Sequence, residues 1–206
     1  MSPPNQKLPQ AVMEQSALQK PEPSDEELML SYQGGDEEAF DRLYDRYHRR
    51  IYNFLLHLAG DRARAQDLFQ MVFLSLHRHR RRYRPSGRFS SWLFTVARNV
   101  ARDEFRRSRR RREVALEPAE GASPADRLAC QANQVTRIER KEMAERVRGA
   151  VQQLPPGQRV VILLSRYGEM SYPEIGKALH ISVNAVKQRA FEAMRSLGKI
   201  LEGGSN

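Results

Sequence analysis

Aromatic residues stand among arginines between residues 83 and 112, and this mixture is the clearest chemical signal in the chain. Four aromatics lie within the first twelve residues of this segment: Tyr83, Phe89, Trp92 and Phe94. Aromatic rings stack on unpaired bases, while arginines contact the phosphates that link them. The loop RPSGR, residues 84–88, is a candidate pocket for a base turned out of the stack. The segment therefore predicts a surface for opened, single-stranded nucleic acid.

The same aromatics have a simpler explanation as core residues. Trp92, Val96 and Val100 recur at four-residue steps, as the buried face of a helix does. In this alternative the rings pack inward and the arginines form an incidental basic surface. Residue types and spacing leave both explanations open.

Positive charge is unevenly placed along the chain, whose net charge is +10. Residues 77–112 contain 14 arginines against two acids, whereas residues 1–47 carry ten acids and four bases. Solubility alone requires no such asymmetry, but a binding site for a polyanion uses it. The distribution predicts a nucleic-acid partner.

A second nucleic-acid signal lies near the C-terminus, in residues 171–201. Ser171 and Glu174 form a capping box that starts a short helix. His180 stands where the chain needs a positive φ, which His tolerates better than most residues. Ser182 can cap a second helix. These features predict a helix-turn-helix over residues 171–190.

The second helix of this motif has two faces. The predicted buried stripe consists of Val183, Val186, Ala190, Ala193 and Leu197. The opposite face consists of Asn184, Lys187, Gln188, Phe191 and Arg195, with Arg189 at its flank. Amides and bases read purine edges in a major groove, and an aromatic ring can contact a thymine methyl. The alternative is a plain helical hairpin with a solvated face.

Helical patterns also precede the arginine-rich segment and must position it. Ser24 and Glu27 form another capping box, which starts a short helix. A longer helix closes at Gly60, and Asp61 can cap the next one. The two helices carry apolar residues at three- and four-residue steps: Phe40, Leu43, Tyr44, Tyr47, Ile51, Phe54, Leu55, Leu58, Leu68, Phe69, Val72, Phe73 and Leu76.

Composition divides the chain into four parts. Residues 1–23 are rich in Pro, Gln and Ser and are expected to be a disordered extension. Residues 113–133 are rich in Pro, Ala, Gly, Ser and acids and read as a flexible linker. Helical periods fill residues 24–112 and 134–202. The predicted fold class is all-α, with two small helical domains joined by that linker.

Several function classes find no support. The one cysteine, Cys130, allows no internal disulfide, and no Cys/His zinc spacing occurs, so a reducing, cytoplasmic setting is expected. No apolar run is long enough to cross a membrane. His77 and His79 have no third metal ligand nearby. Without a phosphate-binding glycine loop or a nucleophile elbow, we expect no enzyme, no metal and no cofactor.

Three ordered segments resemble the extracytoplasmic-function (group IV) sigma factors of bacterial RNA polymerase, which have only the second and fourth sigma regions. DRARAQDLFQMVFLSLHRHR, residues 61–80, is similar to the core-binding segment of that family. FSSWLFTVARNVARDEFRRSRR, residues 89–110, is similar to its promoter-melting and −10-reading helix. Residues 154–194 resemble its −35-reading domain.

The resemblance implies roles for individual residues. Those implied to dock on the β′ clamp helices of core polymerase are Asp67, Leu68, Gln70, Phe73 and Leu74. Those implied to melt and hold the −10 element are Tyr83, Arg84, Arg88, Phe89, Trp92, Arg98, Asn99, Arg102, Arg106 and Arg107. Those implied to read the −35 element are Ser182, Asn184, Lys187, Gln188, Arg189 and Phe191. Further implied partners are the β flap, promoter DNA and an anti-sigma factor.

The resemblance thus implies an alternative sigma factor that directs promoter-specific transcription initiation, with catalysis left to the polymerase. Glu192 and Met194 stand where the family often has basic residues, so no promoter sequence is carried over. A helix-turn-helix regulator that binds duplex operator DNA without polymerase is the alternative. An arginine-rich RNA-binding protein would explain residues 77–112 but leave residues 171–201 without a role.

Overall fold

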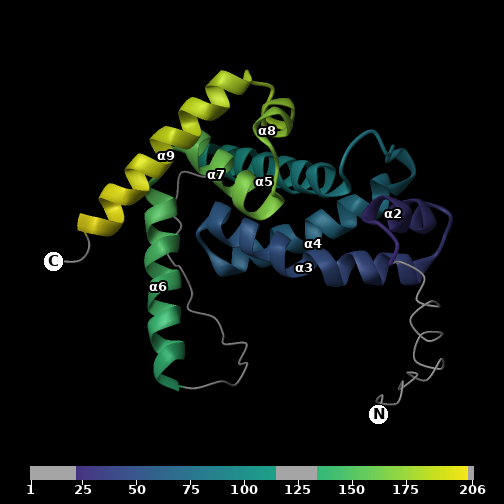
Figure 1. Cartoon of the computed structure of the whole chain (residues 1–206), viewed down its shortest axis with the longest axis horizontal. Coiled ribbons are helices and arrows are strands. Elements are labelled where there is room, and N and C mark those ends of the chain that lie inside the picture. Colours follow the sequence, from purple (N-terminus) through teal and green to yellow (C-terminus); the bar gives the residue numbers. More distant parts are fainter. Residues whose placement is uncertain (1–21, 115–133, 204–206) are drawn as a thin grey trace, which may run out of the picture.

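The computed structural model describes residues 22–114 and 134–203, and every regular element within these ranges is a helix (Figure 1). The structure therefore confirms the all-α fold class. Most of the expected N-terminal extension, and residues 115–133 of the expected linker with Cys130, lie outside the described residues.

The first group of helices surrounds the arginine-rich segment. Its elements are α2 (Asp25–Gln33), α3 (Glu37–Ala59), α4 (Arg62–His79), the single 3-10 turn η1 (Arg80–Arg82) and α5 (Phe89–Val114). The predicted capping box of Ser24 and Glu27 is present, and Asp61 accepts a hydrogen bond from the Arg64 amide to start α4. Gly60 ends α3 with φ 76°, a left-handed conformation that favours glycine.

The second group contains the helix-turn-helix. Its elements are α6 (Gln134–Gln153), α7 (Pro156–Gly168), α8 (Tyr172–Leu179) and α9 (Val183–Gly203). The capping box of Ser171 and Glu174 and the positive φ of His180, 55°, are both confirmed. The Val/Ile-rich segment that follows Pro155 is the helix α7.

Aromatic residues fill the core of the first group and fix α5 against α3. The rings of Phe54 and Phe94 meet edge to face with centroids 5.4 Å apart, and those of Tyr47 and Phe89 do the same at 5.4 Å. All four side chains are buried. Edge-to-face pairs contribute directional stability beyond their buried area. The core therefore sets the position of the start of α5.

The two groups pack against each other, which the sequence did not predict. Helix α7 contacts both α3 and α5, and Figure 1 shows it beside α5 and next to α9. The guanidinium of Arg50 donates two hydrogen bonds to the carbonyl oxygen of Tyr167, at 3.0 and 2.7 Å. The amide of Gln152 donates to the carbonyl of His57 at 2.6 Å. None of the described helices is long and apolar enough to cross a membrane.

Candidate nucleic-acid interface

The aromatic cluster at the start of α5 is mostly core. Tyr83 and Phe89 are 2% and 0% exposed, and their rings contact each other with centroids 5.9 Å apart. The Trp92 ring lies against both, at 5.1 Å from Tyr83 and 5.8 Å from Phe89, but it is only partly buried. In this arrangement neither Tyr83 nor Phe89 can stack on a base. The core explanation describes them, and Trp92 is the ring at the surface.

The Tyr83 hydroxyl is buried without a hydrogen-bond partner in the described part of the chain. Burial raises the pKa of this phenol to about 12, and the negative charges of Glu26 and Asp25 add to the effect. The hydroxyl is therefore neutral at physiological pH. The Tyr83 ring packs against Phe89 and Trp92, and its hydroxyl carries no charge.

Most of the predicted −10 arginines present their side chains to solvent. The exposed ones are Arg84, Arg88, Arg102, Arg106 and Arg107. Arg98 and Asn99 are partly buried, and the guanidinium of Arg98 donates to the Asn99 side-chain oxygen at 2.9 Å. Burial, followed by the neighbouring charge of Arg102, lowers the pKa of Arg98. Helix α5 thus carries several exposed arginines and one partly buried arginine, Arg98.

Two residues of the predicted melting segment are bound by the second helical group. Arg88 donates to the carbonyl oxygen of Glu169 at 3.0 Å and lies 3.9 Å from its carboxylate. The hydroxyl of Ser91 donates to a carboxylate oxygen of Glu174 at 2.6 Å. No local pattern marked these contacts, because the partners are about 80 residues apart in sequence.

The carboxylate of Glu174 serves two elements at once. It accepts from the backbone amide of Ser171 at 2.7 Å, closing the capping box of α8, and from Ser91 of α5. Burial alone would raise its pKa, but the hydrogen bonds from Ser171 and Ser91 outweigh burial and lower it. The Glu174 carboxylate therefore caps α8 and also binds Ser91 near the start of α5.

The predicted −35 face of α9 is exposed. Asn184, Lys187 and Gln188 are exposed, Arg189 is partly buried, and the Phe191 side chain is 71% exposed. The Ser182 hydroxyl accepts from the Ala185 amide at 3.2 Å, so this serine caps the helix. A polar helix face with one unburied aromatic ring has the composition that major-groove reading requires.

The predicted buried stripe of α9 is buried at its centre and partly exposed at its ends. Val186, Ala190 and Ala193 are buried, whereas Leu197 is only partly covered. Val183 is 36% exposed, because it begins the helix and no neighbouring turn covers it. Helix α9 packs against α7, α8 and α6, and Asn184, Lys187 and Gln188 stay exposed.

Glu192 is held between two glutamines. Its carboxylate accepts from the side-chain amide of Gln188 at 3.0 Å and from that of Gln158, on α7, at 3.0 Å. Because the nitrogen of the Gln188 amide points to Glu192, the orientation of this predicted base-reading side chain is fixed. The unusual acid in the family pattern therefore has a positioning role in the structure.

The predicted polymerase-docking residues divide between surface and core. Asp67 and Gln70 are exposed and Leu74 is 53% exposed, whereas Leu68 is 1% exposed and belongs to the core. The ring of Phe73 is partly buried in a cluster with Phe40, Tyr44 and Phe69. Only the exposed residues of α4 can form a contact surface without a rearrangement of the core.

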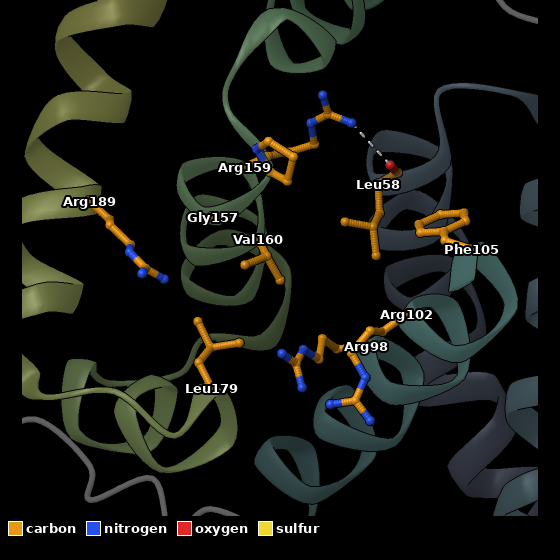
Figure 2. Close-up of a pocket in the computed structure, with 10 residues that line it drawn as sticks. Leu58, Arg98, Arg102, Phe105, Gly157, Arg159, Val160, Leu179 and Arg189 are labelled. Atoms are coloured by element: carbon orange, nitrogen blue, oxygen red, sulfur yellow. Dashed lines mark hydrogen bonds between the residues drawn. The ribbon is translucent and has the colours of Figure 1, made fainter. Parts of the chain in front are cut away.

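A cavity of about 400 Å³ lies between the two helical groups (Figure 2). Its basic lining residues are Arg98 and Arg102 of α5, Arg159 of α7 and Arg189 of α9. Its apolar wall includes Leu58, Phe105, Val160 and Leu179. Arginines predicted for the −10 element and for the −35 element thus face one space. A cavity with this lining concentrates positive potential.

Comparison with known proteins matches both helical groups. The family model Sigma-70 region 2 matches residues 43–111, and Sigma-70, region 4 matches residues 144–197. The RNA polymerase sigma factor CarQ of Myxococcus xanthus is 34% identical, over 84% of this chain and 95% of that protein. The ECF RNA polymerase sigma factor SigX of Bacillus subtilis is 31% identical, over 81% of this chain and 85% of that protein.

A solved structure has the same fold. The sigma factor RpoE of Bartonella quintana, in complex with the anti-sigma factor NepR, superimposes with a TM-score of 0.62 at 18% identity. The match covers 79% of this chain and 96% of that one. The two helical groups, in this order, are the parts of the chain that the sigma-70 region 2 and region 4 models match, and these regions define the class of sigma factors.

The chain belongs to the extracytoplasmic-function sigma factors, alternative sigma factors that direct promoter-specific transcription. The family expected from the three sequence segments is therefore confirmed. The alternative of a regulator that binds operator DNA without polymerase is not favoured, since both sigma regions are matched in order.

Proposed function

We propose that three separate surfaces divide the work of initiation. The exposed residues of α4, Asp67, Gln70 and Leu74, dock on the β′ clamp helices of core polymerase. The loop before α5 and the exposed face of α5 open the −10 element and hold its strand. The exposed face of α9 reads the −35 element, and its domain also meets the β flap.

One observation carries this division of roles. The exposed cations of α5 and the exposed base-reading face of α9 lie on different helical groups, with residues 115–133 between them. The expected linker, residues 113–133, can span at most about 70 Å when extended. That length corresponds to about 20 base pairs of duplex. Such a reach suits two DNA elements on one promoter.

Within the −10 surface, burial assigns different tasks to different residues. Arg84, Arg102, Arg106 and Arg107 contact phosphates, because their side chains are exposed to solvent. Trp92 meets the opened bases with its exposed edge. Tyr83 and Phe89 form the floor that supports it, since both are buried against its ring.

The proposal also covers the localisation, the catalytic activity and the regulation of the protein. The protein acts in the cytoplasm, where promoter DNA and polymerase are found, and it has no catalytic activity of its own. An anti-sigma factor controls it, and the motivation is that the RpoE structure of the same fold contains one. Co-purification from the native cell with the tagged chain tests this partner, and recovery of polymerase subunits alone would reject it.

Run-off transcription tests the proposed function. Core polymerase, the purified protein and the genomic fragment upstream of its own gene are incubated with nucleotides. We expect a discrete transcript that depends on the protein. No transcript, together with no binding of the protein to core polymerase, would reject the function.

The docking surface is tested with a double variant, Asp67→Ala with Gln70→Ala. Both residues are exposed, so the fold should persist, while the affinity for core polymerase falls about tenfold, because docking contacts of this kind dominate binding. Asp45→Ala, an exposed acid on α3, is the matched control. Equal affinity of the double variant and the control would place the docking surface elsewhere.

A further inference from the structure

The loop between η1 and α5 has little structure of its own. Residues 84–88 are all exposed, and within the loop the Ser86 amide donates to the carbonyl of Arg84 at 2.8 Å. Apart from Gly87 itself and its two chain neighbours, no described atom lies within 4 Å of where a side chain on Gly87 would begin. The position of this loop therefore depends on how its two ends are held and on the contact of Arg88 with Glu169.

The upstream end is held by the last residue of α2. The side-chain amide of Gln33 donates to the carbonyl of Tyr83 at 2.9 Å and also to the carbonyl of Arg80. One amide group thus bridges η1 and the first residue of the loop. An alanine at position 33 has no donor that could replace either bond.

The downstream end is held from the first turn of the same helix. A carboxylate oxygen of Glu26 accepts from the backbone N–H of Phe89 at 2.6 Å. Phe89 is the first residue of α5, and the first N–H groups of a helix have no partner within it. A carboxylate at this end also interacts favourably with the helix dipole. Glu26 therefore caps α5 from another helix.

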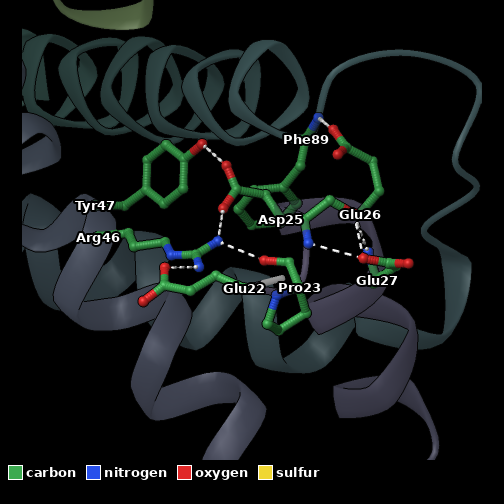
Figure 3. A network of polar contacts seen from close by, with 9 residues as sticks. Glu22, Pro23, Asp25, Glu26, Glu27, Arg46, Tyr47 and Phe89 are labelled. Atoms are coloured by element: carbon green, nitrogen blue, oxygen red, sulfur yellow. Dashed lines mark hydrogen bonds and ion pairs between the residues drawn. The ribbon is translucent and has the colours of Figure 1, made fainter. Parts of the chain in front are cut away.

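Glu26 and Gln33 are seven residues apart, which is about two helical turns, so they share one face of α2. Helix α2 is itself fixed to α3, as Figure 3 shows. Arg46 of α3 donates to the carboxylate of Asp25 at 2.7 Å and to the carbonyl of Pro23 at 3.0 Å. The hydroxyl of Tyr47 donates to the same Asp25. One anchored helix thus spans both ends of the loop.

We propose that α2 is a two-point clamp on the melting loop, in which Glu26 and Gln33 are positioning residues for capture of the opened −10 strand. The inference deepens the proposed function and rests on it. The clamp lies wholly within the first helical group. It therefore persists when the contact of Arg88 with Glu169 is broken.

The clamp acts by reducing the number of loop conformations that must be lost on binding. Arg84 and Arg88 lie between the two held ends, and Trp92 lies one turn beyond the downstream end. Contact groups held in place before binding need no ordering at the moment of contact. Releasing either end should weaken strand capture while leaving the rest of the molecule intact.

Hydrogen exchange on the purified full-length chain tests the clamp without polymerase. Glu26→Ala should raise the exchange rate of the Phe89 amide, and Gln33→Ala should raise the exchange rates around Tyr83. Glu26→Gln keeps an acceptor oxygen and should stay close to the wild type. Ser31→Ala, exposed on the same helix, is the matched control. Equal exchange of the Phe89 amide in wild type and Glu26→Ala would overturn the clamp.

Strand binding tests its role in function. The holoenzyme is titrated with a single-stranded oligonucleotide of the −10 non-template strand, chosen from the start site mapped by run-off transcription. Glu26→Ala and Gln33→Ala should bind it about five- to twentyfold more weakly, as misplaced contact groups do. Affinities for core polymerase and for −35 duplex should not change, and Glu26→Gln should restore strand binding.

The outcomes separate the clamp from the function that it serves. Failure of the wild-type holoenzyme to bind the oligonucleotide would reject the proposed −10 surface. Strand binding by the wild type that is equal in both alanine variants would reject the positioning role. Loss of core affinity or a lower unfolding midpoint in step with strand binding would show that Glu26 and Gln33 only support the fold, which also overturns the proposal.

Discussion

Glu192 stands on the helix face that should meet DNA, where a carboxylate repels phosphates. The structure gives the acid another task, because it binds the side-chain amides of Gln188 and Gln158. With its nitrogen turned to Glu192, Gln188 presents its oxygen elsewhere, and an oxygen accepts from the amino groups of adenine or cytosine. At the scale of single residues, base preference thus depends on a side chain that need not touch a base.

Glu192→Ala should reduce discrimination at the base that Gln188 reads. Without Glu192 the Gln188 amide can flip, so that either its oxygen or its nitrogen faces the base. About 1 kcal/mol of discrimination should then be lost, roughly fivefold. The measurement is competition among −35 duplexes that each carry one base change. Glu202→Ala, an exposed acid near the end of α9, controls for the lost charge. Uniformly tighter binding with unchanged discrimination would mean that Glu192 only repels phosphate.

At the scale of elements, the turn of the helix-turn-helix depends on Gly176. A Cβ at this position would lie 2.9 Å from the carbonyl oxygen of Ile181, and the Ile181 amide donates to the carbonyl of Gly176 at 3.0 Å. The backbone of Ile181 thus packs directly against Gly176. A backbone atom has less room to move away than a side chain.

Gly176→Ala should therefore destabilise the second helical group by about 1–3 kcal/mol, as overpacking does. Gly198→Ala on α9 is the matched control, because its Cβ would meet no described atom within 4 Å beyond its chain neighbours and the nearby backbone of its own helix. Alanine in a helix interior should stabilise that variant by roughly 0.5–1 kcal/mol. Denaturant unfolding followed by circular dichroism measures both. Changes of the same sign in the two variants would contradict the role given to the turn.

Local signals explain which features of the elements were predictable. Ser24, Ser171 and Gly60 lie within a few residues of the groups that they cap, so their roles can be read from adjacent sequence. Glu26 and Phe89 are 63 positions apart, and Arg50 and Tyr167 are 117 apart. Such pairs depend on how helices pack. The sequence left open whether the rings of Tyr83 and Phe89 pack inward or face nucleic acid, and the structure buries both.

At the scale of the whole molecule, packing of the two helical groups competes with DNA contacts of α5. Arg88 and Ser91, at the start of the proposed −10 surface, are bound by Glu169 and Glu174 of the other group. A strand that binds there competes with Glu169 for Arg88 and with Glu174 for Ser91. We call this packed arrangement closed, and we expect use of the proposed −10 surface to require the groups to part.

Arg50→Ala should shift the chain toward an open arrangement. Arg50 donates two hydrogen bonds to the carbonyl of Tyr167 and lies 3.3 Å from the carboxylate of Glu169. Losing hydrogen bonds from a charged group costs about 2 kcal/mol. Small-angle X-ray scattering should show a larger radius of gyration. Arg49→Ala, an exposed neighbour on α3, is the control, and equal radii in the two variants would assign the closure to other contacts.

His57 makes the closed arrangement depend on pH. Its ring stacks on Tyr167 with centroids 5.6 Å apart. Its Nδ1 is buried without a partner in the described part of the chain. Burial, followed by the charge of Arg148, lowers the pKa of His57 below its ordinary value of about 6.5. When the groups part, the imidazole regains that value, so below about pH 6.5 the open arrangement takes up a proton that the closed one excludes.

The closed arrangement should therefore be fully stable above pH 7 and weaken as the pH falls from about 6.5 toward the lowered pKa of His57. Scattering at several pH values between 8 and 5.5, at constant ionic strength, should show the radius of gyration rising over that window. His57→Gln should remove the rise, because an amide does not titrate. His79→Gln, an exposed histidine of α4, should keep it. A rise of equal size in His57→Gln would assign the pH dependence to another group, such as the carboxylate of Glu174.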